Sequence, residues 1–323
     1  MAVHLVRLGH AVTLAPRRME HALAMASNRE NTDYLPGLTL DQNLQIGCEI
    51  RPVVMEADVI LFACPSKALR KTCHRVIQHL DDAWNAHCFL ALCKGLEPET
   101  FKLPHEVIRE ELGKEASVGY LTGPTYAREV AEGKPAAIVV TASGDQTFLG
   151  QIQGALSSDT LRAYRSEDLA GVGLGGCLKN IYAIAAGIAD GHGLGDNARA
   201  ALLTRSLHEM VELGQSLGGR RETFYGLSGF GDLVATCTGD WSRNRTLGLR
   251  IGRGEDAAAI VSGQRSVVEG YAATDCFHAL CQEKNIEAPI LSQIRAILYE
   301  GKPPLEALTE LMGRTLKPEA GKI

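Results

Sequence analysis

The stretch "GVGLGGCLKN", residues 171–180, decides which part of the chain can hold a nucleotide-binding fold. Gly171, Gly173 and Gly176 match G-x-G-x-x-G, the pattern of a loop that binds a dinucleotide pyrophosphate at a helix N-terminus. Such a loop must follow a strand and be followed by a helix and a second strand. Here "SEDLAGV" is not a convincing strand, and "DGHGLGDNA" leads straight into another helix. We therefore interpret these glycines as small residues that let helices approach closely.

The chain before this stretch alternates apolar strands with helices. Near-continuous apolar strands separated by helices indicate a parallel sheet that is covered on both faces. We expect an α/β Rossmann-like, NAD(P)-binding domain over residues 1–165. The predicted strands cover residues 11–15, 58–64, 88–93, 117–123 and 136–142, and an amphipathic helix covers 66–80.

Strand signals nearly vanish after residue 165, and an all-α substrate and catalytic domain is expected over residues 166–323. A chain of 323 residues is long enough for two such domains. One helix is predicted over 197–217, with Asn197 as its cap and Gly218 as its end. Further helices are predicted over residues 255–262, 270–284, 290–299 and 303–312.

The N-terminal residues read as the middle of the first βαβ unit. Residues 2–9 resemble the second half of a helix, and residues 10–15 then form strand two, so the first strand and its glycine turn are missing. A start codon assigned too late, an incomplete record and a truncated paralogue are the alternatives. Strand two is followed by Arg17 and Arg18, where an acid would hold the ribose 2′-hydroxyl of NAD. Two arginines suit a 2′-phosphate and favour NADP over NAD, although they also fit a solvated loop.

The overall composition is that of an ordinary globular protein, with 45% hydrophobic and 22% charged residues. A net charge of −5 gives no general reason to expect nucleic acid or an anionic membrane as a partner. The apolar stretch 181–189 is too short to cross a bilayer, and the N-terminus lacks a signal pattern. None of the nine cysteines forms C-x-x-C, which indicates buried thiols in a reducing cytoplasm and no metal site.

Lys179 is unusual because it lies in "GGCLKNIYAIAAGIA", a run with hardly another charge. Burial there would favour the neutral amine and give a group that exchanges a proton near neutral pH. The alternative is a lysine whose stem packs on the helix while its amine reaches solvent.

Other polar clusters also interrupt apolar surroundings. "KGLE", which starts at Lys94, follows a strand at its carboxyl end, where open α/β sheets bind ligands. "TGPTYAREV" is predicted to open a helix with Pro124 and to offer the amides near Thr125 to an anion. The segment 229–245 carries Asp232 and then "SRN" at 242–244. Each cluster also has a simpler interpretation. In the same order, these are a charge at a strand end, a helix cap, a capping aspartate and a basic turn.

Taken together, these motifs form a recognisable set. "KGLE", "TGPTYAREVAEGKPAA", "LGGCLKNIYAIAAGIADG", "GLSGFGDLVATCT", "SRNR" and "VVEGY" follow one another in this order. From Ala2 to its C-terminus the chain resembles bacterial NAD(P)-dependent glycerol-3-phosphate dehydrogenase, except for the glycine loop that the family carries at its N-terminus. The rival interpretations are another hydroxyacid dehydrogenase, of the ketopantoate or 6-phosphogluconate type, and a non-catalytic remnant.

The resemblance implies reversible hydride transfer between NAD(P)H and dihydroxyacetone phosphate, supplying sn-glycerol 3-phosphate for phospholipid synthesis in the cytoplasm. It implies a catalytic group in which Lys179 exchanges the proton, Lys94 stabilises negative charge and Asp232 holds Lys179. The same three residues are expected to bind substrate, together with Gly123, Thr125, Ser242, Arg243 and Asn244. The residues expected to bind the cofactor are Arg17, Arg18, Lys94, Ala127, Arg243, Val267 and Glu269. A homodimer is compatible with the sequence.

Overall fold

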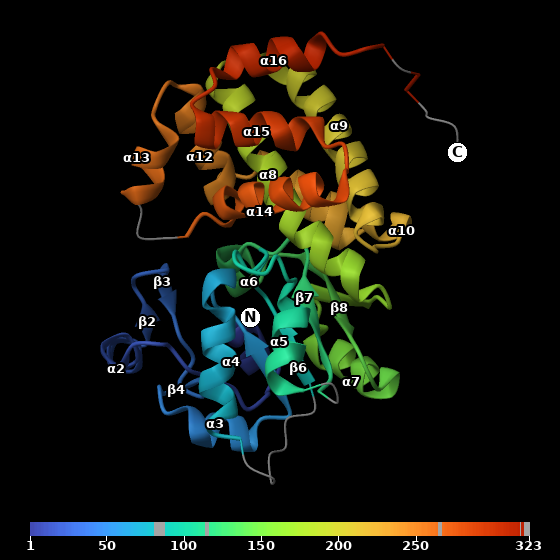
Figure 1. Ribbon diagram of the computed structural model, residues 1–323. Coiled ribbons are helices and arrows are strands. Elements are labelled where there is room, and N and C mark those ends of the chain that lie inside the picture. Colours follow the sequence, from blue (N-terminus) through green and yellow to red (C-terminus); the bar gives the residue numbers. More distant parts are fainter. Residues whose placement is uncertain (81–87, 114–115, 264–266, 317, 320–323) are drawn as a thin grey trace.

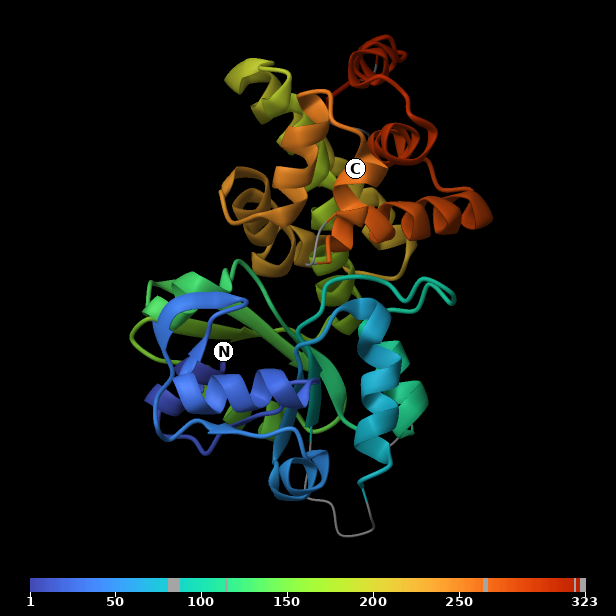
Figure 2. The same cartoon turned by 90° about the vertical axis from the view of Figure 1, so that its left-hand side faces the viewer.

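The computed structural model describes residues 1–80, 88–113, 116–263, 267–316 and 318–319. Two parts are stacked on each other in both views: an α/β part built by the N-terminal half and a helical part built by the C-terminal half (Figures 1 and 2). The fold class predicted from the sequence is therefore confirmed. The last strand ends at Arg165 and the first long helix begins at Leu169, on either side of the predicted boundary.

The α/β part contains nine strands and seven α-helices within the described residues. Its strands are β1 (Thr13–Leu14), β2 (Glu30–Asn31), β3 (Leu35–Thr39), β4 (Gln45–Ile46), β5 (Val59–Phe62), β6 (Cys88–Ala91), β7 (Val118–Thr122), β8 (Ala136–Ala142) and β9 (Leu161–Arg165). Its α-helices are α1 (Ala2–Arg7), α2 (Met19–Asn28), α3 (Ile50–Glu56), α4 (Leu69–Ile77), α5 (Pro104–Leu112), α6 (Ala127–Glu132) and α7 (Gln146–Leu156). A short 3-10 helix, η1 (Ser66–Ala68), precedes α4. All five predicted strands are present, whereas the hairpin β2–β3 and the strands β4 and β9 were not predicted.

The main sheet has the order β5-β6-β7-β8-β9 and is covered on both faces, as predicted. Apolar residues of α4 and α5 pack on one face, and those of α1 and α7 on the other. The predicted parallel pairing holds for β5–β6, β6–β7 and β8–β9, but β8 runs antiparallel to β7. Gly123 turns the chain after β7 with a φ of 131°, and an added Cβ would lie 3.1 Å from the carbonyl oxygen of Ala137. The strands β1 and β4 pair with each other in a separate parallel sheet.

The helical part is organised around the long helix α8. The elements of this part are α8 (Leu169–Gly191), α9 (Gly195–Ser216), α10 (Arg221–Phe224), the π-helical turn η2 (Leu227–Gly231), α11 (Asp232–Thr238), α12 (Arg243–Gly252), α13 (Ala257–Ser262), α14 (Glu269–Lys284), α15 (Pro289–Glu300) and α16 (Pro304–Met312). The helix α8 is long and apolar enough to cross a membrane by length and composition, but 94% of its most apolar segment is buried inside the protein. It is a core helix, surrounded by the other helices (Figure 1).

Two sequence-based details of the helical part are wrong. Helix α9 begins at Gly195, so Asn197 lies inside the helix rather than at its cap. Helix α12 was not predicted, because its sequence "RNRTLGLRIG" mixes charges with apolar residues and resembles a basic turn. The end of α9 is as predicted: Gly218 follows with a φ of 97°, a conformation that favours glycine.

The glycines of the opening stretch allow close packing, as the sequence indicated. An added Cβ on Gly173 would lie 2.6 Å from the hydroxyl of Tyr120 in β7. One on Gly175 would lie 2.8 Å from the carbonyl oxygen of Ser228 in η2. The start of α8 therefore rests directly on the sheet and on the neighbouring turn, and the G-x-G-x-x-G pattern here is inside a helix rather than in a loop.

Further along α8, glycines set its distance from α12. A Cβ on Gly187 would lie 2.0 Å from the carbonyl oxygen of Arg245, and one on Gly248 would lie 2.0 Å from that of Ile184. Each helix thus has a glycine at the contact, and the absence of a side chain there lets the two backbones approach closely. This contact fixes where the first turn of α12 lies relative to α8.

We predict that Gly187→Ala destabilises the protein, because its methyl group must displace the backbone of α12. Overpacking of this kind costs about 1–3 kcal/mol or more. The matched control is Gly154→Ala in α7, where an added Cβ has nothing within 4 Å. That change should stabilise by about 0.5–1 kcal/mol through helix propensity alone. Thermal and denaturant unfolding midpoints measure both effects, and equal shifts for the two variants would contradict this account.

Candidate active site

Three charged side chains from distant parts of the sequence meet at the junction of the two parts. Lys94 follows β6 at the carboxyl end of the sheet, Lys179 lies in α8, and Asp232 is the first residue of α11. Asp232 is 2% exposed and Lys179 is 6% exposed. The helices α8 and α11 and the end of β6 thus enclose ionic groups that water cannot solvate freely.

The carboxylate of Asp232 holds both amines. The Nζ of Lys179 donates to Oδ1 at 2.5 Å, and the Nζ of Lys94 donates to Oδ2 at 2.5 Å. A buried carboxylate needs charged or hydrogen-bonding partners to offset its desolvation, and each oxygen here receives one. When both amines are protonated, the group of three carries one net positive charge.

Burial and charge act in opposite directions on this group. Burial lowers the pKa of Lys179 to about 8; the negative charge of Asp232 opposes this, and the positive charge of Lys94 adds to it. For Asp232, burial alone raises the pKa, but the two ammonium groups outweigh it and leave the pKa below its ordinary value. The site therefore pairs a permanently charged carboxylate with an amine that can gain or lose a proton near neutral pH.

Thr236 also contacts Lys179, and it was not among the site residues predicted from the sequence. Its Oγ1 accepts a hydrogen bond from Lys179 Nζ at 2.7 Å, and donates to the carbonyl oxygen of Asp232 at 2.6 Å. The hydroxyl fixes the amine from a second side. Asp232 and Thr236 are four residues apart in "DLVATCT", a spacing that places both on one face of a helix. This spacing is the sequence signal that could have identified Thr236.

Lys94 is held by the segment that follows β7. Its Nζ donates to the carbonyl oxygen of Gly123 at 3.0 Å, and the hydroxyl of Thr125 donates to the same oxygen at 3.1 Å. Pro124 does not open the helix as predicted, because α6 begins at Ala127 and has Tyr126 as its N-cap. The predicted residues of this segment therefore lie in the turn beside Lys94, and Ala127 is exposed at the helix start.

The segment "SRN" forms the N-terminus of α12. Ser242 is the N-cap, and its hydroxyl accepts from the backbone N–H of Arg245 at 3.2 Å. Within the residues that the structure describes, Arg243 is exposed and has no hydrogen-bond or ion-pair partner. A free guanidinium at a helix N-terminus suits an anion, because the unpaired N–H groups there add to the attraction.

Asn244 belongs to a chain of buried amides that crosses the junction. Its Nδ2 donates to Oδ1 of Asn180 at 2.8 Å, and Nδ2 of Asn180 donates to the carbonyl oxygen of Lys94 at 2.9 Å. The other end of the chain is the Oδ1 of Asn244, which accepts from the N–H of Gly270 at 2.9 Å. These bonds join the strand end that carries Lys94 to α8, α12 and α14.

The residues predicted to bind a cofactor do not form a single cluster. Glu269 begins α14, directly after Val267 and Val268, and contacts the α/β part through Ser66. Arg17 and Arg18 follow β1 and are exposed, and Arg18 pairs with Asp33 at 3.5 Å. The structure thus brings Lys94, Lys179 and Asp232 into contact, and leaves both arginines outside that group.

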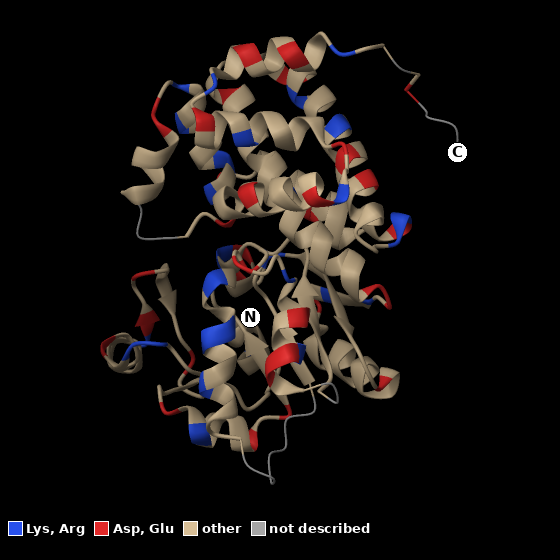
Figure 3. Cartoon of the chain, viewed as in Figure 1, with Lys and Arg blue, Asp and Glu red and all other residues tan. Residues whose placement is uncertain are grey.

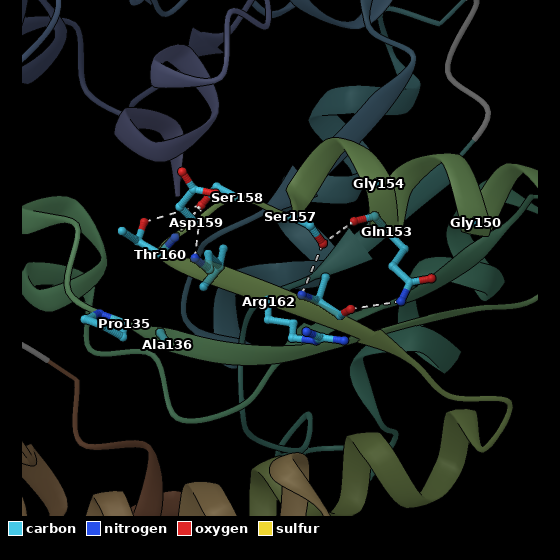
Figure 4. A pocket seen from close by; sticks show the side chains of 12 residues that line it. Pro135, Ala136, Gly150, Gln153, Gly154, Ser157, Ser158, Asp159, Thr160 and Arg162 are labelled. Carbon is cyan, nitrogen blue, oxygen red and sulfur yellow. Dashed lines mark hydrogen bonds between the residues drawn. The ribbon is translucent and has the colours of Figure 1, made fainter.

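Two further surface features lie away from this group. A pocket of about 740 Å³ between α7 and β9 is lined by residues such as Gln153 and Ser157, whose side chains bond to the backbone of Ala163 (Figure 4). No predicted site residue lines it. Positive and negative residues are interspersed over both parts of the chain in the view of Figure 3. The attraction for an anion must therefore come from the local group of lysines and from Arg243.

Comparison with known proteins connects this geometry to one family. The family model described as NAD-dependent glycerol-3-phosphate dehydrogenase N-terminus matches residues 1–148, and the corresponding C-terminus model matches residues 168–309. A glycerol-3-phosphate dehydrogenase [NAD(P)+] from Syntrophotalea carbinolica is 42% identical over 96% of this chain and 93% of its own length. One from Thiobacillus denitrificans is 43% identical, with the same coverage of both chains.

Comparison with solved structures points to the same family. The glycerol-3-phosphate dehydrogenase of Coxiella burnetii is 37% identical, with a TM-score of 0.91 over 97% of this chain and 94% of that one. A ketopantoate reductase from Ralstonia eutropha has a TM-score of 0.57 at 16% identity, over 94% of each chain, a likeness that shows the fold alone.

Proposed function

We infer the roles of individual residues from one premise: the chain belongs to the NAD-dependent glycerol-3-phosphate dehydrogenase family. We propose that it interconverts dihydroxyacetone phosphate and sn-glycerol 3-phosphate, and that bound NAD(P)H supplies the hydride. The observation that carries this proposal is the pair of amines on one buried carboxylate, at the carboxyl end of the sheet where open α/β folds bind ligands.

Lys179 is the proton-transfer group in this proposal. When hydride reaches the central carbon, the carbonyl oxygen becomes an alkoxide and needs a proton. An amine with a pKa of about 8 can donate that proton in reduction and accept it in oxidation. Asp232 and Thr236 orient the amine, and Lys94 adds a second positive charge that stabilises the developing negative charge.

Arg243 and the N-terminus of α12 are the proposed phosphate site. The unpaired guanidinium and the free N–H groups of the first turn match the oxygens of a phosphate monoester. Ser242 and Asn244 flank Arg243, and Gly123 and Thr125 line the side of Lys94. A phosphate monoester offers three acceptor oxygens and a charge of about −1.5 to −2, whereas a carboxylate offers two oxygens and one charge, which favours the proposed substrate over a ketopantoate-type acid.

Arg17, Arg18, Ala127, Val267 and Glu269 are the proposed cofactor contacts, in addition to Lys94 and Arg243. The two arginines after β1 are exposed and suit the 2′-phosphate of NADP. Glu269 can accept hydrogen bonds from cofactor hydroxyl or amide groups. We further propose a cytoplasmic enzyme, in which the nine cysteines stay free thiols. A homodimer is compatible with the proposal.

Lys179→Ala tests the proposal most simply. Loss of a general acid or base costs about 10²–10⁴ in rate, so kcat should fall by about that factor. Binding of dihydroxyacetone phosphate, measured by calorimetry, should change little. The control is Lys134→Ala, an exposed lysine that pairs with Glu132 on the surface. Turnover retained by the Lys179 variant would remove that residue from the mechanism.

Arg243→Ala should chiefly weaken binding of the phosphorylated substrate. Hydrogen bonds to charged groups contribute about 1.5–3 kcal/mol, which corresponds to a rise in KM of about 10- to 150-fold. Arg250→Ala is the matched control, because Arg250 lies on the same helix and pairs with Glu255 at the surface. An unchanged KM for the Arg243 variant would count against the phosphate site.

Replacing both Arg17 and Arg18 by alanine should raise the KM for NADPH about tenfold, because charge-assisted bonds to the 2′-phosphate are lost. The KM for NADH should stay within about twofold, since NADH lacks that group. Steady-state kinetics with each cofactor measures the two effects. Equal changes for NADPH and NADH would show that the arginines do not read the 2′-phosphate.

A further inference from the structure

The carboxylate of Glu269 makes an unusual contact across the junction of the two parts. The backbone N–H of Ser66 donates to its Oε1 at 3.0 Å, and the hydroxyl of Ser66 donates to its Oε2 at 2.6 Å. Ser66 opens η1 and α4 directly after β5, so it lies at the carboxyl end of the main sheet. Glu269 lies at the start of α14 in the helical part.

Both residues have surroundings that fix this contact. Ser66 is 7% exposed. A Cβ on Gly95 would lie 2.6 Å from Oε2 of Glu269 and 2.7 Å from the hydroxyl of Ser66, so only a glycine leaves room for the pair beside Lys94. Next to Glu269, the N–H of Gly270 is bound by Asn244. The position of the carboxylate is therefore set from the sheet, from the loop after β6 and from α14.

The part of the chain that the structure describes supplies hydrogen bonds but no cation to this carboxylate. Among the residues that the structure describes, no lysine, arginine or histidine forms an ion pair with Glu269. Ser66 provides two of the hydrogen bonds that a carboxylate with about four acceptor positions can accept. Glu269 is partly exposed, so the remaining positions are available to donors of a bound molecule.

We propose that Ser66 is a positioning residue for the cofactor: its two hydrogen bonds hold the Glu269 carboxylate where it accepts hydrogen bonds from the bound dinucleotide. This inference rests on the proposed cofactor role of Glu269. The inference goes beyond that role because it assigns a part in cofactor binding to Ser66, at the start of η1 after β5, which acts through Glu269 of the helical part. A ligand group held in place before binding needs less ordering when the ligand arrives.

The test is Ser66→Ala, which removes the hydroxyl and keeps the backbone bond. The dissociation constant of NADPH, measured by fluorescence titration, should rise about tenfold, the order expected for one hydrogen bond to a charged group. The value of kcat and the KM for dihydroxyacetone phosphate should stay within about twofold. Ser66→Thr, which keeps a hydroxyl, should restore affinity.

Ser157→Ala is the matched control, because that serine makes two hydrogen bonds within the α/β part and lies at α7 and β9. Glu269→Ala provides the decisive second arm, because it removes the carboxylate that Ser66 holds. In that background Ser66→Ala should have no further effect on NADPH affinity, since the two changes break one interaction. Should Ser66→Ala fail to fold, Glu269→Ala alone must still raise the dissociation constant of NADPH.

The inference is overturned if Ser66→Ala behaves like the Ser157 control, or if its effect adds fully to that of Glu269→Ala. A weakened Ser66→Ala variant that Ser66→Thr does not restore would also overturn it. Failure of the proposed function looks different, because the unmodified chain would then not reduce dihydroxyacetone phosphate with either NADPH or NADH.

Discussion

The structure depends on one buried carboxylate that binds two amines. Asp232 could not stay ionised in this apolar environment without Lys94 and Lys179, since an unpaired buried charge costs several kcal/mol. The three residues come from α11, from the end of β6 and from α8, so the ion pairs can form only when the two parts of the chain are joined correctly. Burial of the same group lowers the pKa of the Lys179 amine to about 8, although the charge of Asp232 opposes that lowering. Burial therefore creates both the need for ion pairing and an amine that can exchange a proton.

The close packing of α8 makes this arrangement geometrically accessible. Glycines at its start bring it against β7 and η2, and Gly187 brings it against α12. Lys179 thereby lies between the sheet, which carries Lys94, and the helix start that carries Arg243. The side-chain amides of Asn180 and Asn244 connect these elements through hydrogen bonds. A glycine pattern that resembles a nucleotide loop thus serves helix packing, and the ionic site is built on the helix that it forms.

Much of the fold was readable from the sequence, because apolar runs and helical spacing report burial directly. The strands β5 to β8 and the long helices follow these patterns, whereas β9 escaped notice because "LRAYR" is short and carries two arginines, unlike the apolar runs of the inner strands. The antiparallel direction of β8 depends on the connection through Gly123 and α6, which periodicity does not report. For the site, an isolated lysine in an apolar helix was a visible signal. Its contact with a carboxylate 53 residues away was not, and the family resemblance supplied the remaining assignments.

The pH dependence of kcat/KM in both reaction directions tests the central claim most directly. In the proposed mechanism, the amine of Lys179 must be protonated for reduction of dihydroxyacetone phosphate and neutral for oxidation of sn-glycerol 3-phosphate. With a pKa of about 8, the rate of reduction should fall as the pH rises through about 8, and the rate of oxidation should rise through the same value. Limbs of the same sign in both directions, or no titration between pH 7 and pH 9, about one unit on either side of that pKa, would contradict the account.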